Sequence, residues 1–220
     1  MVHIYQRDGV FYPSVTTIIG EMLDEPEGLT NWKLKNLDWE KQTNRSAIIG
    51  TLVHYRILNE LAPQTLELPD ICFEDIPKDA LKRVELSQLM WEELGLKIGH
   101  PRKVEKFAVN NEFKFAGKPD LVAPINDVYT LVDLKTSREV RENHKIQMGG
   151  YSVLLERTPE QAMLVSLHPN SRGNEFMRAH TVIMPRKELD EYAERFIEMT
   201  KEFHKRGLSE KLMKENGVVH

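Results

Sequence analysis

The sequence predicts an α/β fold with a helical N-terminal portion and a strand-rich core. Apolar residues in roughly the first hundred positions recur at helical spacing. After about residue 100 the pattern changes to short runs rich in β-branched and aromatic residues, which are typical of strands. A chain of 220 residues also falls in the size range of one folded unit. We therefore expect residues 1–100 and 101–220 to be two portions of a single unit.

The N-terminal portion is expected to begin with a hairpin and to continue as helices. Residues 2–12 alternate loosely around Asp8-Gly9, a good turn dipeptide. Ser14 is a candidate N-cap for the first helix. Residues 29–61 have a strongly helical pattern, and we expect two helices separated by a break near Thr43-Asn44.

A loop and one more helix complete this portion. The stretch 62–76 contains two prolines and mixed polarity, so we expect a loop there. Residues 77–96 have an amphipathic pattern, and Pro77 suits the first position of a helix. The apolar positions expected on its faces are Leu81, Val84, Leu89 and Trp91.

The strand-rich core is expected to follow the order βββαββα. A turn signal at residues 169–173 separates the last two strands. The expected elements are strands over 104–109, 113–122 and 128–134, a helix over 144–156, strands over 162–167 and 176–184, and a long helix after Pro185.

Composition excludes several classes of protein. The single cysteine, Cys72, excludes an intrachain disulfide, an all-cysteine zinc site and a cysteine-ligated iron–sulfur cluster. No apolar run approaches the roughly 18 residues that span a bilayer, and the first residues lack a signal peptide's apolar stretch. We therefore expect no membrane partner and a cytoplasmic location. A net charge of −4 gives no global basic field for nucleic acid, although metal-dependent nucleases keep carboxylates in their sites.

Two segments of the core place acidic residues on neighbouring strands. If residues 126 and 127 form a two-residue turn, Asp120 faces Asp133 directly, with Cβ atoms about 5 Å apart. Asp133 and Lys135 lie two residues apart on one strand and project to one face, while Leu134 points to the core. A four-residue turn would make the two carboxylates diagonal neighbours and would leave them on the same face.

Two carboxylates and an ammonium at one spot suit metal-assisted hydrolysis of a phosphodiester. Like charges on facing strands are destabilising unless a cation lies between them. Oxygen ligands bind Mg²⁺ or Mn²⁺ and leave positions for water and a phosphate oxygen. Lys135 would orient that water, help to deprotonate it or neutralise the transition state. The alternative is an exposed strand edge with an ion pair between Asp133 and Lys135.

Two helical motifs accompany these residues. Gln147 and Tyr151 are four residues apart and share a helix face. The glycine pair Gly149-Gly150 between them costs about 1 kcal/mol per residue relative to alanine, so we expect close packing on the sheet or close approach of a nucleic-acid backbone. Gly50 lies one helical turn before His54 and leaves room for the imidazole or for a strand beneath. His54 is a candidate nitrogen ligand for the metal.

These motifs resemble the PD-(D/E)XK nuclease superfamily, specifically its branch of RecB-type nuclease domains. CRISPR-associated RecB-like exonucleases and the mitochondrial genome-maintenance exonuclease are relatives in this branch, and residues 12–18 are similar to an opening motif of the latter. The resemblance covers roughly residues 12–155. It depends on four motifs in order, which are Gly50-xxx-His54, Gly117-x-Pro119-Asp120, Asp133-x-Lys135 and Gln147-xxx-Tyr151.

The resemblance implies a restriction-endonuclease-like core, over residues 101–220, with a central mixed sheet flanked by helices. It also implies that Lys135 is catalytic and that Gln147 and Tyr151 support the active site or contact DNA. Many relatives carry four cysteines for an iron–sulfur cluster, which this chain lacks, so we expect Mg²⁺ or Mn²⁺ and no iron–sulfur cluster. The metal-binding groups implied are His54, Asp120, Asp133 and the carbonyl of Leu134.

Further candidates have weaker support. Glu105 stands where relatives often hold an acidic residue on the first core strand, and an exposed strand glutamate is the alternative. Trp39 lies two turns from Trp32 and is a candidate for stacking on unpaired bases, with a core position as the alternative. The better candidates for DNA phosphates follow Lys135 directly and are Arg138, Arg141 and Lys145.

The sequence as a whole predicts a metal-dependent DNA exonuclease that prefers single-stranded DNA or DNA ends. Its expected role is in DNA repair, recombination or replication. One alternative is a catalytically weak or inactive module that binds DNA ends or single strands. Another is a non-haem iron or other metalloenzyme using His54 and carboxylates, but the sequence lacks a His-x-Asp pair with a distal histidine. Oligomeric state and cleavage polarity stay open.

Overall fold

The computed structural model describes residues 2–69, 71, 76–169 and 178–217. Cys72, most of the expected turn at 169–173 and the start of the expected strand 176–184 lie outside these residues. The helices are α1 (Val15–Met22), α2 (Glu27–Lys35), α3 (Trp39–Leu61), α4 (Lys78–Glu93), α5 (Glu142–Val153), α6 (Arg186–Lys205) and α7 (Leu208–Glu215). The strands are β1 (Ile4–Arg7), β2 (Val10–Pro13), β3 (Lys103–Val104), β4 (Ala108–Asn110), β5 (Phe115–Gly117), β6 (Leu121–Ile125), β7 (Val128–Lys135), β8 (Gln161–Ser166) and β9 (His180–Pro185).

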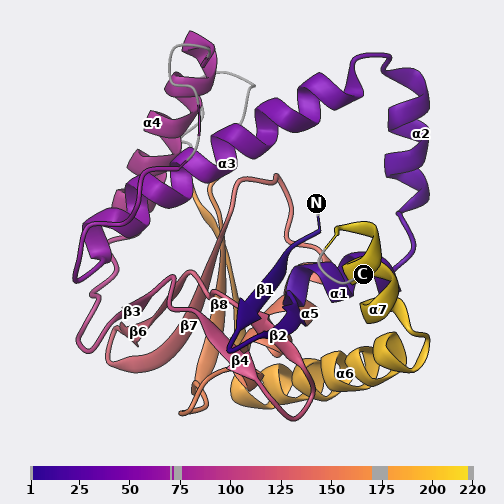
Figure 1. Ribbon diagram of the computed structural model, residues 1–220. Coiled ribbons are helices and arrows are strands. Elements are labelled where there is room, and N and C mark those ends of the chain that lie inside the picture. Colours follow the sequence, from indigo (N-terminus) through magenta and orange to yellow (C-terminus); the bar gives the residue numbers. More distant parts are fainter. Residues whose placement is uncertain (1, 70, 72–75, 170–177, 218–220) are drawn as a thin grey trace.

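A five-stranded sheet in the order β3-β6-β7-β8-β9 lies at the centre of the molecule (Figure 1). The β7–β8 pair is parallel and the other three pairs are antiparallel, so the sheet is mixed. Helices α3 and α4 cover one face, and α1, α5 and α6 cover the other. The expected α/β fold, with a mixed sheet flanked by helices, is confirmed.

The turn between β6 and β7 has the two residues that the sequence indicated. Asn126 and Asp127 both have positive φ, at 48° and 71°, as a two-residue hairpin turn requires. Leu121 therefore pairs with Val132 and Ile125 with Val128. This register, extended by one residue beyond β6, places Asp120 opposite Asp133.

The hairpin and the first helix also form as expected. The turn at Asp8-Gly9 joins β1 to β2. The hydroxyl of Ser14 caps α1 by accepting a hydrogen bond from the backbone N–H of Thr17 (3.0 Å).

The expected break near Thr43-Asn44 is wrong. Those residues lie inside α3, and the chain breaks earlier, between α2 and α3. Asn36 is the C-cap residue of α2, and its side-chain amide donates to the carbonyl of Trp32 (2.7 Å) in the last turn. Asp38 is the N-cap residue of α3 and accepts a hydrogen bond from the side chain of Gln42 (2.8 Å).

Helix α4 lies where the sequence placed it but buries a different face. Val84 and Trp91 are buried, as expected, whereas Leu81 and Leu89 are 43% and 53% exposed. Pro77 is the N-cap residue and α4 begins one residue later.

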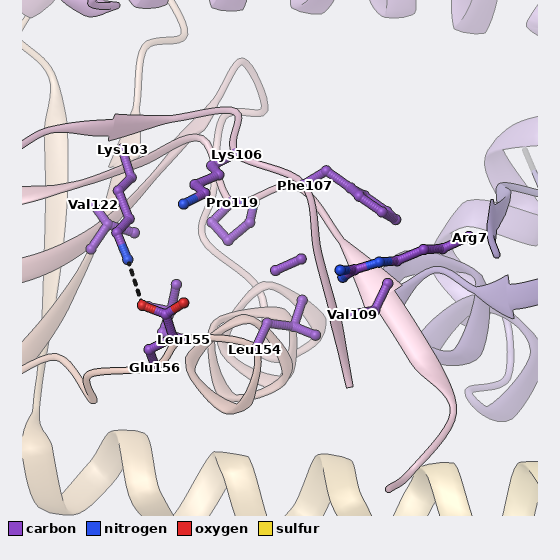
Figure 2. Close-up of a pocket in the computed structure, with 11 residues that line it drawn as sticks. Arg7, Lys103, Lys106, Phe107, Val109, Pro119, Val122, Leu154, Leu155 and Glu156 are labelled. Atoms are coloured by element: carbon purple, nitrogen blue, oxygen red, sulfur yellow. Dashed lines mark ion pairs between the residues drawn. The ribbon is translucent and has the colours of Figure 1, made fainter. Parts of the chain in front are cut away.

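The first two core strands are each divided in two. Glu105 has a positive φ of 43°, which separates β3 from β4. Pro119, which has no N–H to donate, lies between β5 and β6. The pieces β4 and β5 form their own two-stranded sheet. As a result Lys106, Phe107 and Pro119 line one cavity beside the main sheet (Figure 2).

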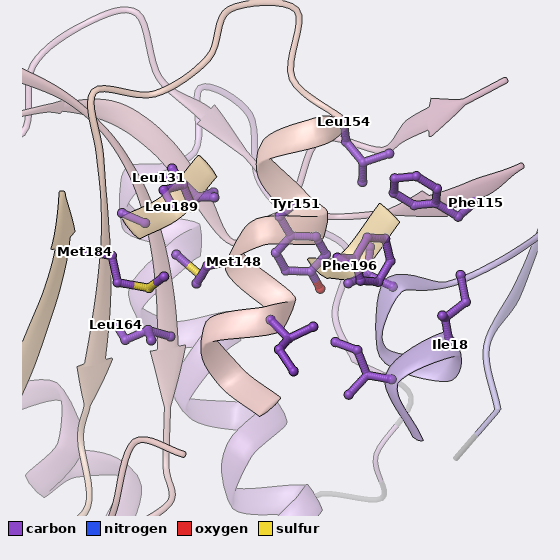
Figure 3. Packing of buried hydrophobic residues seen from close by; sticks show 14 of the residues in the cluster. Ile18, Phe115, Leu131, Met148, Tyr151, Leu154, Leu164, Met184, Leu189 and Phe196 are labelled. Carbon is purple, nitrogen blue, oxygen red and sulfur yellow. The ribbon is translucent and has the colours of Figure 1, made fainter. Parts of the chain in front are cut away.

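Two apolar cores lie on opposite faces of the sheet. Leu131 belongs to the core under α5 and α6, and Leu134 belongs to the core under α3 and α4. Figure 3 shows the first of these, where Met148 of α5 and Phe196 of α6 pack together with residues of the sheet. Asp133 lies two residues from Leu131 and shares its face, beneath α5.

The glycine pair in α5 allows close packing on α6. A Cβ at Gly149 would lie 2.3 Å from the carbonyl carbon of Tyr192, and one at Gly150 would lie 2.8 Å from a methyl group of Val15. The expected close approach therefore exists, but its partners are α6 and α1 and not the sheet. Within the described residues, no helix is both long enough and apolar enough to cross a membrane.

Candidate active site

The candidate site lies where β7 ends, on the face covered by α5. Asp133 is 1% exposed, and Lys135 is two residues further along the same strand. The Lys135 ammonium lies 2.6 Å from Asp133 Oδ2. The side chain between them, Leu134, is buried in the opposite core, as the alternation of strand residues requires.

Asp120 enters the site from the segment between β5 and β6. Its Oδ2 accepts a hydrogen bond from the backbone N–H of Leu134 (2.7 Å). That bond joins Asp120 to the strand carrying Asp133 and Lys135, at the position that the register predicts.

Gln147 of α5 links the other groups of the site. Its side-chain oxygen accepts from Lys135 Nζ (2.9 Å), and its amide donates to Asp133 Oδ1 (3.2 Å) and to the Tyr151 hydroxyl (3.1 Å). Gln147 and Tyr151 are each 8% exposed. Gln147 thus holds Asp133 and Lys135 in place, with Tyr151 behind it, and contact with DNA stays a prediction.

His54 reaches the site from α3, which covers the face of the sheet opposite α5. Its Nε2 donates to the carbonyl oxygen of Leu134 (2.9 Å), and its Nδ1 lies 3.4 Å from Asp120 Oδ1. A Cβ at Gly50, one turn earlier, would be 3.4 Å from the hydroxyl of Thr136. Gly50 thus lies beside the chain that leaves β7, at a separation where a Cβ would make an ordinary van der Waals contact.

Burial and mutual charge shift the pKa values of these groups. Burial, together with the charge of Asp120, raises the pKa of Asp133 to about 6, although the Lys135 ammonium opposes this shift. Burial lowers the pKa of His54, but the carboxylate of Asp120 outweighs it and raises that pKa to about 9. Burial acts to raise the pKa of Asp120, yet His54 and Lys135 hold it below its usual value.

Glu105 lies next to Asp120. Its backbone N–H donates to the carbonyl of Asp120 (3.0 Å). Burial and then the negative charge of Asp120 raise the pKa of the Glu105 carboxyl. The structure therefore brings this candidate beside the site, at the point where the first core strand divides.

A groove of about 680 Å³ borders the site at His54. His54, Glu105 and Lys118 line it, and residues 66–69, which follow α3, form part of its wall. The sequence interpretation did not single out Lys118, although its place between Gly117 and Pro119 of the acidic motif is a signal that could have found it.

The candidate DNA contacts differ in position. Arg138 and Arg141 are exposed near the start of α5, whereas Lys145 pairs with Glu188 of α6 (2.8 Å). Trp39 is half-buried and belongs to neither core, and Lys33 Nζ lies 4.8 Å from the centroid of its ring. The alternative that Trp39 is a core residue is therefore wrong.

The donor atoms fit a hard divalent cation. Asp133 Oδ2 is buried, and its partner among the described residues is the Lys135 ammonium. Carboxylate and carbonyl oxygens are preferred ligands of Mg²⁺ and Mn²⁺. In the described ranges no three His, Cys, Asp or Glu side chains already form a metal-binding group. His54 bonds to the Leu134 carbonyl, and Lys135 lies against Asp133.

Comparison with known proteins identifies one family. The model of the PD-(D/E)XK nuclease superfamily matches residues 31–212. No curated protein matches the chain. Solved structures with a similar course of the chain include LHK-Exo in complex with dAMP (12% identity, 91% of each chain covered, TM-score 0.41) and the alkaline exonuclease LHK-Exo from Laribacter hongkongensis (12% identity, 87% of this chain and 91% of that chain, TM-score 0.36). At TM-scores below 0.5, these likenesses add nothing to the assignment of the site.

Proposed function

This chain belongs to the PD-(D/E)XK nuclease superfamily, and from that membership we propose that it is a Mg²⁺- or Mn²⁺-dependent DNA exonuclease. It hydrolyses phosphodiester bonds, prefers single-stranded DNA or DNA ends, and acts in DNA repair, recombination or replication. The observation that carries the proposal is the convergence of Asp120, Asp133 and Lys135 at the end of β7.

Oxygen ligands around this point would hold the metal. Asp120 and Asp133 are the primary candidates, and the Leu134 carbonyl and His54 lie beside them. A divalent cation bound there would stabilise negative charge on the phosphate and lower the pKa of a bound water. For His54 to become a metal ligand through Nε2, its hydrogen bond to the Leu134 carbonyl must break.

Lys135 is the group proposed to act on the substrate. Asp133 and Gln147 hold its ammonium from two sides, so it enters the reaction already oriented and loses little side-chain entropy. Its N–H groups can donate to a phosphate oxygen or orient the attacking water. Gln147 holds both members of the pair and is a positioning residue.

The shape of the groove supports a single strand as substrate. Helix α3 and residues 66–69 border it, and His54 is among its lining residues. A duplex about 20 Å wide fits such a groove poorly, whereas an unpaired strand can enter from its end. Figure 1 shows α2 and the N-terminal part of α3 extending away from the sheet, and Trp39 at the start of α3 offers a face for an unpaired base.

A digestion panel tests this function. End-labelled linear and circular substrates, each single- and double-stranded, are incubated with Mg²⁺, Mn²⁺, Ca²⁺ or excess EDTA. We expect cleavage of linear single strands in Mg²⁺ or Mn²⁺ and binding with little chemistry in Ca²⁺. Tight DNA binding without cleavage under any metal condition would favour a binding module instead.

A further inference from the structure

A second cavity, distinct from the catalytic groove, lies beside the sheet (Figure 2). Its volume is about 440 Å³, within the range of pockets that bind small molecules. Three cations from separate elements line it, namely Arg7 of β1, Lys103 of β3 and Lys106. Phe107 and Leu154 supply apolar surface.

One wall separates this cavity from the groove. Glu105 and Lys118 line the groove, whereas their neighbours Lys106 and Pro119 line the second cavity. The wall consists of residues 105–106 and 118–119, and a hydrogen bond from the Glu105 N–H to the Asp120 carbonyl joins the two segments. In each segment one residue faces the groove and the next faces the second cavity. The cavity is therefore a separate site that shares a wall with the catalytic one.

The charge of the cavity is positive. Glu156 is the carboxylate that lines it, and it lies 3.6 Å from Lys103 at an exposed position. Arg7 extends into the cavity in Figure 2, and its partner Asp8 is 3.6 Å away and almost fully exposed. Among the described residues Lys106 has no ion pair. Exposed ion pairs contribute little to stability, so these cationic side chains are available to bind an anion.

We infer that this cavity binds the 5′-phosphate group of a nucleotide. The guanidinium of Arg7 can give a phosphate two parallel hydrogen bonds, and Lys106 adds a further positive charge to the same cavity. Phe107 and the apolar wall suit the base and sugar, because an aromatic ring stacks on any base. A volume of about 440 Å³ has room for one nucleotide.

The nucleotide has two sources, a free mononucleotide or the end of a bound strand. Both present the same phosphate chemistry, and two titrations separate them. The inference concerns binding and does not depend on cleavage, so it is tested in the Asp133→Asn variant with EDTA, where the proposed hydrolysis is blocked. Its failure would leave the proposed function intact.

The experiment is calorimetric titration of that variant with dGMP and with a short 5′-phosphorylated single strand. Adding Arg7→Ala with Lys106→Ala should weaken binding of at least one probe by about tenfold or more. Lys118→Ala is the matched control, because Lys118 is on the other side of the same wall. Glu156→Gln should tighten binding by removing the competing carboxylate. Deoxyguanosine, which lacks the phosphate, should bind at least tenfold more weakly than dGMP, if dGMP is the probe that binds.

The outcomes separate the possibilities. Loss of dGMP binding in the double variant identifies a free nucleotide as the ligand, and loss only with the phosphorylated strand identifies a strand end. Binding of neither probe overturns the inference. So does binding that Lys118→Ala weakens and the double variant does not, since the nucleotide would then lie in the catalytic groove.

Discussion

Asp133 has two carboxylate oxygens with different neighbours. Oδ1 accepts a hydrogen bond from Gln147, and Oδ2 lies against the Lys135 ammonium. We expect Asp133→Asn and Asp120→Asn each to reduce cleavage by at least about 10³-fold and to weaken Mg²⁺ or Mn²⁺ binding. Metal affinity measured by calorimetry and turnover of a labelled strand check both effects.

Lys135→Ala is the complementary change. It should abolish cleavage to a similar degree while leaving metal affinity close to that of the wild type, because an ammonium contributes no ligand. Near-normal turnover of a folded Lys135→Ala protein, with circular dichroism as the control for folding, would remove Lys135 from the proposed mechanism.

His54 makes stability depend on pH in the absence of metal. Its pKa is raised from 6.5 to about 9, so its protonated form stabilises the folded protein fully below pH 6.5. This contribution is lost as the pH rises to about 9, and the loss is on the order of 3 kcal/mol at most. The pKa of Asp133 is raised to about 6, so its titration changes the free energy of unfolding at lower pH than the titration of His54 does.

Urea denaturation in EDTA at pH 6.5 and pH 9 measures the effect. The free energy of unfolding should fall between these values in the wild type and fall much less in His54→Gln. An equal fall in both proteins would show that another group carries the pH dependence.

The close packing of α5 on α6 requires a residue without a side chain at position 149. A Cβ there would lie 2.3 Å from the backbone of α6, so Gly149→Ala should destabilise the protein by about 2–3 kcal/mol. Gly20 is the matched control, since it also lies in a helix and a Cβ there would meet nothing within 4 Å. Gly20→Ala should stabilise by about 0.5–1 kcal/mol. Thermal or urea unfolding distinguishes the two, and a neutral Gly149→Ala would contradict the packing.

Elements set by local chemistry could be predicted from the sequence. The register that puts Asp120 opposite Asp133 follows from a two-residue turn at 126–127, and strand alternation then places Lys135 beside Asp133. The cap at Ser14 is equally local.

Features that depend on distant parts of the chain were missed. The reason for Gly149 lies in α6, more than forty residues away. The exposure of Leu81 and Leu89 depends on which side of α4 meets the sheet, and a helical pattern alone does not fix that side. The division of the core strands requires the pairing of β4 with β5.

At the scale of the whole molecule, the groove beneath α3 predicts that a free end is needed. A covalently closed single-stranded circle should be degraded far more slowly than a linear strand of equal length. Comparable rates for the two substrates would show that cleavage occurs internally.

A substitution of Trp39 tests whether base stacking holds the DNA strand. It is half-buried outside both cores, so Trp39→Ala should leave the protein folded. Loss of stacking should raise KM by about five- to a hundredfold, with a smaller effect on kcat. An unchanged KM would exclude base stacking at this position.

The central claim is that Asp120, Asp133 and Lys135 form a metal-dependent nuclease site. The most direct measurement is the release of nucleotides from an end-labelled linear single strand, comparing the wild type with Asp133→Asn in Mg²⁺ and in excess EDTA. We predict release by the wild type in Mg²⁺ alone and none by the variant in either condition. Undiminished release in EDTA, or by Asp133→Asn, would contradict the claim.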